Sequence, residues 1–396
     1  MTNSDDANVG YTGEYQSGPV AGSAVIPSVN HGDREVHYAD VDGLAVFEGD
    51  IVLGTVAEIQ AKIGPEGIGI TGDQLRWPDA TVPYEIDSAL PDQQRITDAV
   101  AHWAANTRIR FIPRTATHSD FVRFRPSTAS RSHVGRRGGR QDIELSNTAP
   151  TGTVIHEMGH ALGLWHEQSR EDRNTFIEVR FANIAAANQH NFNQHITDGD
   201  DIGTYDFGSI MHYPATAFST NGQATIVPRD ALPPGVVMGQ RNGLSRGDRD
   251  AAHALYPWSG IYTIRQKSTG RFLDAHETAA DNLDFRLVTR QAQNNDTQRW
   301  RLTPIGDAYT IRQRSNGRFV DAHESEAKDF RLVTRTAQNN DTQRWVIRAA
   351  EAGNFTLQQL SNRRFVDAHE NDLNDFSVVT RNAQNNDTQR WIIDPL

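Results

Sequence analysis

The feature that most constrains the fold of this chain is a short run in which three histidines recur at fixed intervals. On an α-helix, His156 and His160 lie one turn apart on the same face, so their ring nitrogens can converge on one metal ion. Glu157 points toward the same side, where it can take a proton from a metal-bound water without being a ligand. Gly163 allows the backbone to leave the helix with a positive φ, which brings His166 round as a third ligand. Three ligands and an open fourth position are typical of a hydrolytic zinc site rather than a closed structural one.

A second motif downstream agrees with this interpretation. The alternative is an ordinary amphipathic helix that happens to be rich in histidine, and such a helix would need no companion motif. Ser209–Tyr213 has the sequence of the methionine turn that this class of zinc site places beneath the metal, with Met211 as the methionine. Two separate segments therefore predict the same zinc centre.

Six segments of the chain share the pattern of one known family. They are Trp77–Tyr84, Ile96–Arg114, Val134–Gln141, Thr153–Arg173, Met238–Ser245 and Leu255–Pro257. Over about residues 68–258 the chain thus resembles the astacin family of metzincin zinc endopeptidases. The resemblance implies an α+β catalytic domain that holds one zinc ion and hydrolyses peptide bonds in protein or peptide substrates.

The resemblance also implies roles for the polar residues of the motifs. His156, His160 and His166 would bind the zinc ion, and Glu157 would be the general base. Tyr213 is similar to the family tyrosine that reaches the metal and swings away to support the oxyanion. These residues are the predicted catalytic and metal-binding set.

Three further positions are expected to support this set. Met211 would lie beneath the metal, and Gly163 would form the turn that leads to the third ligand. Glu167 would be the family carboxylate that meets the N-terminus of the mature enzyme.

The periodicity within the catalytic region is consistent with an α+β domain. Gln93–Asn106 has apolar residues at helical spacing, which predicts a helix. Val82–Ile86, Asp120–Phe124 and Asp142–Leu145 are short segments typical of strands.

The first 67 residues are predicted to form an inhibitory pro-segment. Residues 1–30 are rich in Gly, Ser, Asn and Asp with little periodicity, which predicts a mobile tail. Phe47–Asp50 is similar to the aspartate-switch motif of astacin propeptides, in which a carboxylate occupies the open zinc position. Asp50 is therefore expected to bind the metal in the zymogen only. The alternative is a plain surface turn, and maturation cleavage is expected between Gly64 and Gly72.

An internal repeat dominates residues 259–396. The triplet Gln-Arg-Trp recurs with its tryptophan at Trp300, Trp345 and Trp391, spaced by about 45 residues. Three copies, each with Gly or Asn turns and β-branched segments, favour closure into a β-trefoil over the larger number of blades in a propeller. The Q-x-W signature resembles that of ricin-type lectins, so the chain is expected to end in an all-β trefoil domain.

Carbohydrate binding by this trefoil is a weaker expectation. Asp274, Asp321 and Asp367 match the sugar-binding aspartates of the ricin-type family. However, the family's aromatic platform is absent from the repeats, and Thr stands before the Gln where Asn is usual. Two hypotheses stay open: a trefoil that binds carbohydrate or another surface ligand, and a trefoil with a structural or docking role.

The composition limits the partners and the location of the protein. The formal net charge is −11, and residues 1–66 hold 11 of the acidic residues against two basic ones. Without a basic stripe interleaved with aromatic residues, nucleic acid is not an expected partner. No apolar run approaches the ~20 residues needed to span a bilayer. Although no signal peptide is visible and no cysteine is present, the resemblance implies a secreted protein, and a monomer is expected.

Two functions from different classes are compatible with these observations. The first is a secreted zinc endopeptidase made as a self-inhibited zymogen, with a trefoil that directs it to its substrates. The second is a lectin-like binding protein built on a catalytically silent protease scaffold. A silent scaffold predicts loss of a zinc ligand or of Glu157, and all four residues are present. The sequence therefore favours the enzyme.

Overall fold

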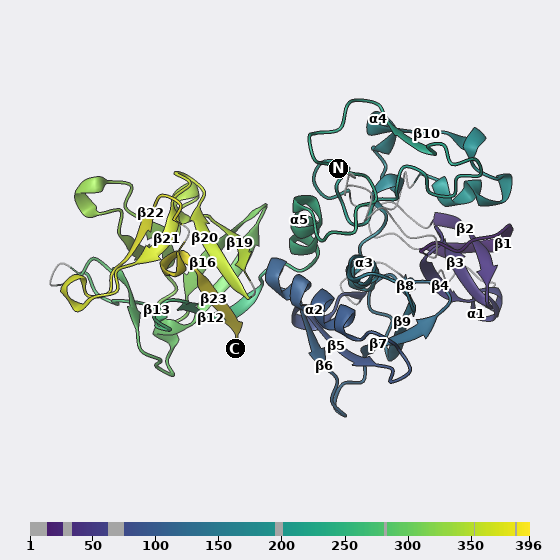
Figure 1. Cartoon of the computed structure of the whole chain (residues 1–396). Coiled ribbons are helices and arrows are strands. Elements are labelled where there is room, and N and C mark those ends of the chain that lie inside the picture. The colour runs from purple at the N-terminus through teal and green to yellow at the C-terminus, as the bar shows by residue number, and fades with distance from the viewer. Residues whose placement is uncertain are drawn as a thin grey trace, which may run out of the picture. The chain divides into compact units, whose positions relative to one another are not determined.

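The computed structural model describes residues 14–26, 34–61, 75–194, 201–280, 283–351, 353–384 and 386–396. The chain forms two compact units (Figure 1). The first comprises the residues up to Ala104 together with Ile109–Tyr256, and the second comprises Ala105–Arg108 together with Pro257–Leu396. Within the described residues, no helix is both long enough and apolar enough to cross a membrane.

A nine-stranded sheet organises the first unit, in the order β1-β2-β3-β4-β8-β9-β7-β5-β6. Its first four strands, purple in Figure 1, belong to residues 14–61, which we call the N-terminal segment. They form an antiparallel meander whose last strand pairs in parallel with β8. The N-terminal segment therefore extends the sheet of the domain that follows it. The strands are β1 (Val20–Ile26), β2 (Arg34–Val41), β3 (Leu44–Phe47), β4 (Ile51–Thr55), β5 (Thr81–Ile86), β6 (Arg110–Pro113), β7 (Phe121–Ser127), β8 (Arg131–His133) and β9 (Arg140–Ser146).

The described part of residues 1–30 is not the mobile tail that its composition predicts. Val20–Ile26 forms β1, paired with β2, and the side chain of Glu14 is fully buried. The local sequence of this segment does not favour a strand. Pairing with β2 and burial against the rest of the unit give it its order. Residues 1–13 and 27–33 lie outside the described residues, as does the predicted cleavage region between Gly64 and Gly72.

Two helices and the sheet enclose the main core of the first unit. Trp103 on α2, Met158 on α3 and Phe124 on β7 are fully buried members of one apolar cluster. The expected helix is α2, and the expected strands are β5, β7 and β9. The α-helices are α1 (Val56–Ala61), α2 (Gln94–Asn106), α3 (Thr151–Leu162), α4 (Arg173–Phe176) and α5 (Arg246–Leu255). The remaining elements are the 3-10 helices η2 (Pro78–Ala80), η3 (Glu167–Ser169), η4 (Phe181–Asn183) and η5 (Ala186–Phe192), and the paired strands β10 (Ile177–Val179) and β11 (Ile226–Pro228).

The second unit is the expected β-trefoil, with four strands from each of three repeats. Trp300, Trp345 and Trp391 are fully buried in one core, and each indole Nε1 donates to a backbone carbonyl of its own repeat. The first strand, β12, pairs with the last, β23, which closes the barrel. The strands are β12 (Gly260–Gln266), β13 (Phe272–Ala275), β14 (Leu287–Arg290), β15 (Trp300–Ile305), β16 (Ala308–Gln313), β17 (Phe319–Ala322), β18 (Leu332–Arg335), β19 (Trp345–Glu351), β20 (Asn354–Gln359), β21 (Phe365–Ala368), β22 (Val378–Arg381) and β23 (Trp391–Pro395).

Candidate metal centre

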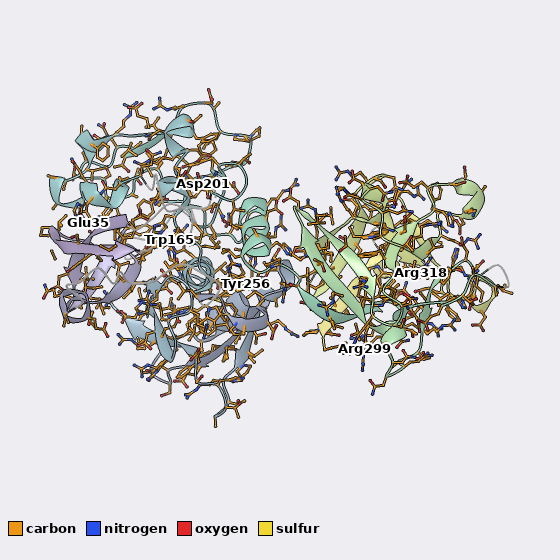
Figure 2. All side chains as sticks on the ribbon, turned by 180° about the vertical axis from the view of Figure 1, so that it is seen from behind. Glu35, Trp165, Asp201, Tyr256, Arg299 and Arg318 are labelled. Carbon is orange, nitrogen blue, oxygen red and sulfur yellow. The ribbon has the colours of Figure 1, made fainter. Side chains whose placement is uncertain are left out.

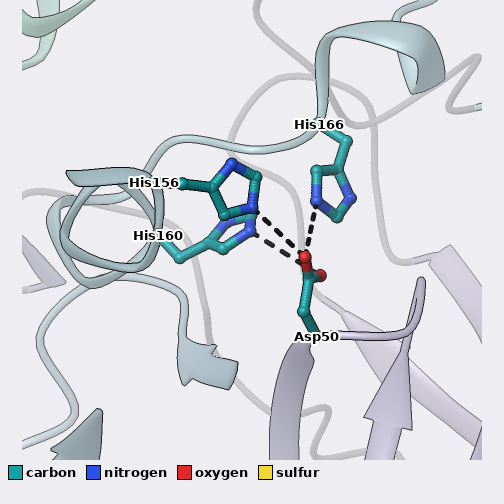
Figure 3. A group of neighbouring side chains, drawn as sticks. All are labelled: Asp50, His156, His160 and His166. Atoms are coloured by element: carbon teal, nitrogen blue, oxygen red, sulfur yellow. Dashed lines mark hydrogen bonds and ion pairs between the residues drawn. The ribbon is translucent and has the colours of Figure 1, made fainter. Parts of the chain in front are cut away.

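The three predicted histidines lie together with Asp50 of the N-terminal segment (Figure 3). One ligand atom from each of the four side chains lies within 4.8 Å of all the others. The Nε2 atoms of His156 and His166 are each 3.2 Å from Asp50 Oδ2, and that of His160 is 3.7 Å from Oδ1. All four side chains are buried. Three imidazoles and one carboxylate form a donor set that fits a zinc ion.

Local structure aims each histidine Nε2 at this centre. His156 and His160 lie on α3, which ends where Gly163 takes a φ of 110° and turns the chain toward His166. The Nδ1 atom of each ring donates a hydrogen bond away from the centre, which leaves the Nε2 lone pair free for a metal. The acceptors are the carbonyls of Ile210 and Leu164 for His156 and His160, both at 2.8 Å, and the Glu48 carboxylate for His166, at 2.7 Å.

Glu157 is a buried carboxylate without a hydrogen-bond partner among the described residues. Burial, and after it the charge of Asp50, raises the pKa of Glu157 well above its usual range. An unpartnered buried carboxylate is costly to a fold. Its position on α3 between two metal-ligand candidates gives that cost a functional explanation, because a general base must have free oxygens.

The methionine turn packs directly against α3. A Cβ atom on Gly159 would lie 2.8 Å from Met211 Sδ, so a larger residue at this position of α3 would have to displace the methionine. Asp248 on α5 fixes the turn: its carboxylate accepts hydrogen bonds from Ser209 Oγ at 2.6 Å and from the Ile210 N–H at 2.9 Å. The sequence does not reveal this anchor, because Asp248 lies far along the chain and its local pattern indicates only a helix-capping residue.

The tight turn between β3 and β4 presents Asp50 to the histidines. Glu48 and Gly49 both have positive φ values, 48° and 80°. A Cβ atom on Gly49 would lie 2.8 Å from Phe218, so only glycine fits this closely packed position. The Tyr213 hydroxyl donates to the backbone carbonyl of Glu48. The N-terminal segment thus presents Asp50 to the histidines and also accepts a hydrogen bond from the predicted catalytic tyrosine, Tyr213.

A second buried contact joins the N-terminal segment to the rest of the first unit. Arg241 Nε lies 2.5 Å from Glu14 Oε1, and both side chains are buried. Arg241 also donates to the Tyr15 hydroxyl at 2.7 Å, and the Tyr15 ring packs on Tyr213 with centroids 4.6 Å apart. The Gln16 N–H donates to the Gly49 carbonyl at 2.8 Å, which ties this contact to the Asp50 turn.

Glu167 also lies beside the centre and is enclosed by the protein. Its carboxylate accepts a hydrogen bond from the Asp206 N–H at 2.7 Å and lies 3.7 Å from Arg170. Burial raises the pKa of Glu167 to about 8. Its predicted partner, the mature N-terminus, would come from residues outside the described part of the chain.

The three candidate ligand-binding aspartates of the trefoil are buried and hydrogen-bonded within their own repeats. In each, Oδ1 accepts from the next residue's N–H at 2.7–2.8 Å. Oδ2 accepts from the Gln side chain of the Q-x-W triplet at 3.2 Å. The residues are Asp274 with Gln298, Asp321 with Gln343, and Asp367 with Gln389. These contacts account for the aspartates as internal braces of each repeat.

Two known protein families match this chain, one along most of the first unit and one at the start of the second. Residues 70–257 match the astacin peptidase family, and residues 255–339 match the ricin-type β-trefoil lectin domain-like family. Residues 70–257 therefore form an astacin domain, the catalytic domain of a family of zinc metalloproteinases, and a ricin-type trefoil follows it.

Individual relatives match about half of this chain. Zinc metalloproteinase nas-13 of Caenorhabditis elegans is 38% identical over 57% of this chain and 53% of its own length. Blastula protease 10 of Paracentrotus lividus is 37% identical over 54% of this chain and 39% of its own length. The solved structure of high choriolytic enzyme 1, a hatching enzyme zinc-protease of Oryzias latipes, is 35% identical, covering 46% of this chain and 92% of that one, with a TM-score of 0.42. This chain thus spans about half or less of the first curated relatives that it matches.

Proposed function

We propose that this protein is the latent form of a zinc-dependent endopeptidase. The observation that carries the proposal is the meeting of three histidine Nε2 atoms beside an unpartnered buried carboxylate, Glu157. When bound, zinc lowers the pKa of a water ligand to about 7 and polarises a substrate carbonyl. His156, His160 and His166 would hold the ion.

The protein side chains then supply proton transfer and orientation. Glu157 accepts a proton from the attacking water and passes it to the leaving amine, which its free oxygens allow. Tyr213, once released from the Glu48 carbonyl, can donate a hydrogen bond to the oxyanion. The retained Glu157 separates this proposal from the alternative of a silent, lectin-like scaffold.

Latency would rest on the N-terminal segment. Asp50 would take the place of the water ligand, which its short distances to the histidine Nε2 atoms and the tight turn at Glu48 and Gly49 support. The Glu14–Arg241 ion pair is a second contact between the N-terminal segment and the domain that holds the histidines. It lies far along the chain from the Asp50 contact. We propose that both must separate before a substrate can enter.

The setting of the enzyme is part of the proposal. Family resemblance supports a secreted monomer that acts on proteins, with a trefoil that binds carbohydrate or another surface ligand. The internal bonding of Asp274, Asp321 and Asp367 favours a ligand site elsewhere on the trefoil over one built on these carboxylates.

The direct test of the enzyme is metal-dependent cleavage of an unfolded protein. After limited proteolysis removes the N-terminal segment, the protein should contain one zinc ion, cleave the substrate, lose activity to a chelator and regain it with added Zn²⁺. A zinc-loaded, folded protein that cleaves no peptide in a diverse library would refute the proposal and favour the binding scaffold.

The test of latency uses the uncleaved chain. Asp50→Ala should raise the basal cleavage of a short peptide by about tenfold or more. Removing one partner of a buried ion pair costs about 3–5 kcal/mol, so the N-terminal segment should bind the rest of the domain more weakly. Glu14→Gln should raise it less, since a hydrogen bond to Arg241 can survive. Glu35→Ala, an exposed carboxylate on β2 (Figure 2), is the matched control. Equal basal activity in all three variants would show that neither contact maintains latency.

A further inference from the structure

Four arginines form a compact block on the outer face of two trefoil strands. Arg301 on β15 lies directly opposite Arg312 on β16. The Arg314 N–H donates to the Arg299 carbonyl at 2.9 Å, which continues this register and places Arg299 opposite Arg314 (Figure 2 labels Arg299). Trp300 begins β15 and points into the core, so its chain neighbours, Arg299 just before the strand and Arg301 within it, point to the other face.

The charges of this block are poorly balanced by acidic neighbours. Asp296 pairs with both Arg299, at 3.0 Å, and Arg314, at 3.5 Å. Within the described part of the trefoil, no carboxylate forms an ion pair with Arg301 or Arg312. Like charges directly opposite each other on antiparallel strands destabilise a sheet. The fold therefore retains an arrangement that packing alone does not favour.

The block opens into a polar hollow of about 360 Å³. Arg312 Nε donates to the Gly317 carbonyl at 2.8 Å, which holds its guanidinium over the turn after β16. Its terminal nitrogens have no acceptor among the described residues, and neither does the Ser315 hydroxyl. The lining residues are Arg301, Arg312, Gln313, Arg314, Ser315, Asn316 and Gly317. The lining is thus cationic and polar, without an aromatic side chain.

The other two repeat junctions provide an internal comparison. At the β19–β20 junction only one of the four positions is cationic, and at the β23–β12 junction the cations have two carboxylates beside them, Asp387 and Asp394. The corresponding residues are Arg344, Val346, Gln358 and Leu360 at the former and Arg390, Ile392, Arg265 and Lys267 at the latter. The trefoil fold therefore does not require arginine at these positions.

We propose that the β15–β16 arginine block binds a sulfated polysaccharide. Guanidinium groups form paired, charge-assisted hydrogen bonds with oxoanions, and a two-by-two array matches a polymer with several sulfate groups better than a single anion. The absence of an aromatic lining disfavours nucleic acid, whose bases stack on aromatic rings. This site differs from the repeated aspartates and does not depend on peptidase activity.

The test measures binding of the full-length chain to dextran sulfate, to neutral dextran and to single-stranded DNA. The decisive variant is Arg301→Val with Arg312→Gln, which installs the residues found at the corresponding positions of the β19–β20 junction in the same fold. Its control, Lys328→Gln with Arg363→Gln, removes two other exposed cations of the trefoil. A further variant, Arg301→Lys with Arg312→Lys, keeps the charge but loses the paired geometry.

The parent should bind dextran sulfate, more weakly at higher salt, and should not retain neutral dextran. The decisive variant should lose about tenfold or more in affinity for dextran sulfate, because two charge-assisted contacts are removed. Its melting temperature should be unchanged or raised, because two like charges no longer face each other across the strands. The control should stay within about twofold, and the lysine variant should fall between. Equal affinity of the decisive and control variants would overturn the proposal. Tighter binding of DNA than of dextran sulfate would assign the block to nucleic acid instead.

Discussion

Asp50 of the first unit and the three repeated aspartates of the trefoil are all buried carboxylates, but their oxygens are used in opposite ways. Each trefoil aspartate has both oxygens bonded by donors of its own repeat. Asp50 faces three histidine Nε2 atoms, and its Oδ1 has no hydrogen-bond partner among the described residues. A residue repeated with the same bonds supports the fold, whereas a residue that converges with remote, unsatisfied groups points to chemistry.

Glu157 extends this contrast to the first unit as a whole. Its two oxygens are buried without a partner, and His160 Nε2 beside it also lacks one within the described chain. The Q-x-W glutamines of the trefoil, equally buried, use both their side-chain oxygen and nitrogen, as Gln298 does with the Gln293 N–H and Asp274. At the metal centre, carboxylate and imidazole atoms without partners lie close together, where a metal and a substrate can use them.

The largest expected effect tests whether Glu157 is a proton carrier. Glu157→Gln should retain stoichiometric zinc but lose peptide hydrolysis in the activated enzyme by more than the ~10²–10⁴-fold typical of general-base catalysis, because the carboxylate also polarises the water. Elemental analysis and kcat on a short peptide check the two parts. A zinc-loaded Gln variant with near-normal turnover would remove Glu157 from the chemistry and leave its burial unexplained.

The next-largest effect is a pH dependence of the stability of the first unit. Burial lowers the pKa of His133, on β8 beneath the N-terminal segment, to about 4, and its Nδ1 donates to the Val52 carbonyl at 2.9 Å. The unfolded chain, with a histidine pKa near 6.5, binds this proton more readily. The free energy of unfolding should therefore fall as pH is lowered from about 6.5 to about 4, by up to about 3 kcal/mol from this residue.

Gln at this position isolates the effect, because it can donate to Val52 but cannot take up a proton. Buried carboxylates such as Glu167 shift in the opposite sense, so the quantity to measure is the difference in urea unfolding midpoints between parent and His133→Gln. This difference should change in favour of the variant as pH falls through the window. A difference that is constant from pH 7 to pH 4 would show that His133 is not held neutral by burial.

A smaller effect tests the structural role of the trefoil aspartates. Asp321→Ala leaves the buried Ala322 N–H and one bond of Gln343 without an acceptor, so the trefoil should lose about 1–3 kcal/mol of stability. Asp274→Ala and Asp367→Ala should cost similar amounts, because their bonds are the same. A variant of unchanged stability that has lost carbohydrate binding would instead identify Asp321 as a ligand residue.

The sequence predicted the parts of the site whose geometry is local. His156, Glu157 and His160 lie on one helix, so their spacing alone defines a metal-binding face. The sequence could not predict the pairing of Glu14 with Arg241, because the two lie 227 residues apart and neither belongs to a spacing pattern. The β1 strand was missed for a related reason: its partner and the burial around it, not its composition, give it order.

The fold of the trefoil was predictable because the sequence repeats it three times. Each buried tryptophan marks the same strand of its repeat, and three similar four-stranded units fit a trefoil barrel of twelve strands. What the repeat obscures is the departure from symmetry. The β15–β16 arginine block becomes visible only when the strand register places Arg301 opposite Arg312 and the other two junctions are compared with it.

The smallest expected effect concerns the independence of the two units. All residues of the metal centre, from Asp50 to Tyr213, belong to the first unit, and the buried apolar clusters of the two units share no residue. Deleting residues 260–396 should therefore leave kcat/KM for a short peptide within about threefold of the full activated enzyme, less than about 1 kcal/mol of transition-state stabilisation. The deleted form should lose cleavage of a substrate attached to a sulfated or glycosylated surface, where binding by the trefoil raises the local concentration. A folded, zinc-loaded truncated protein that cannot cleave the short peptide would show that the trefoil belongs to the active unit, and the contrast between a catalytic unit and a binding unit would then fail.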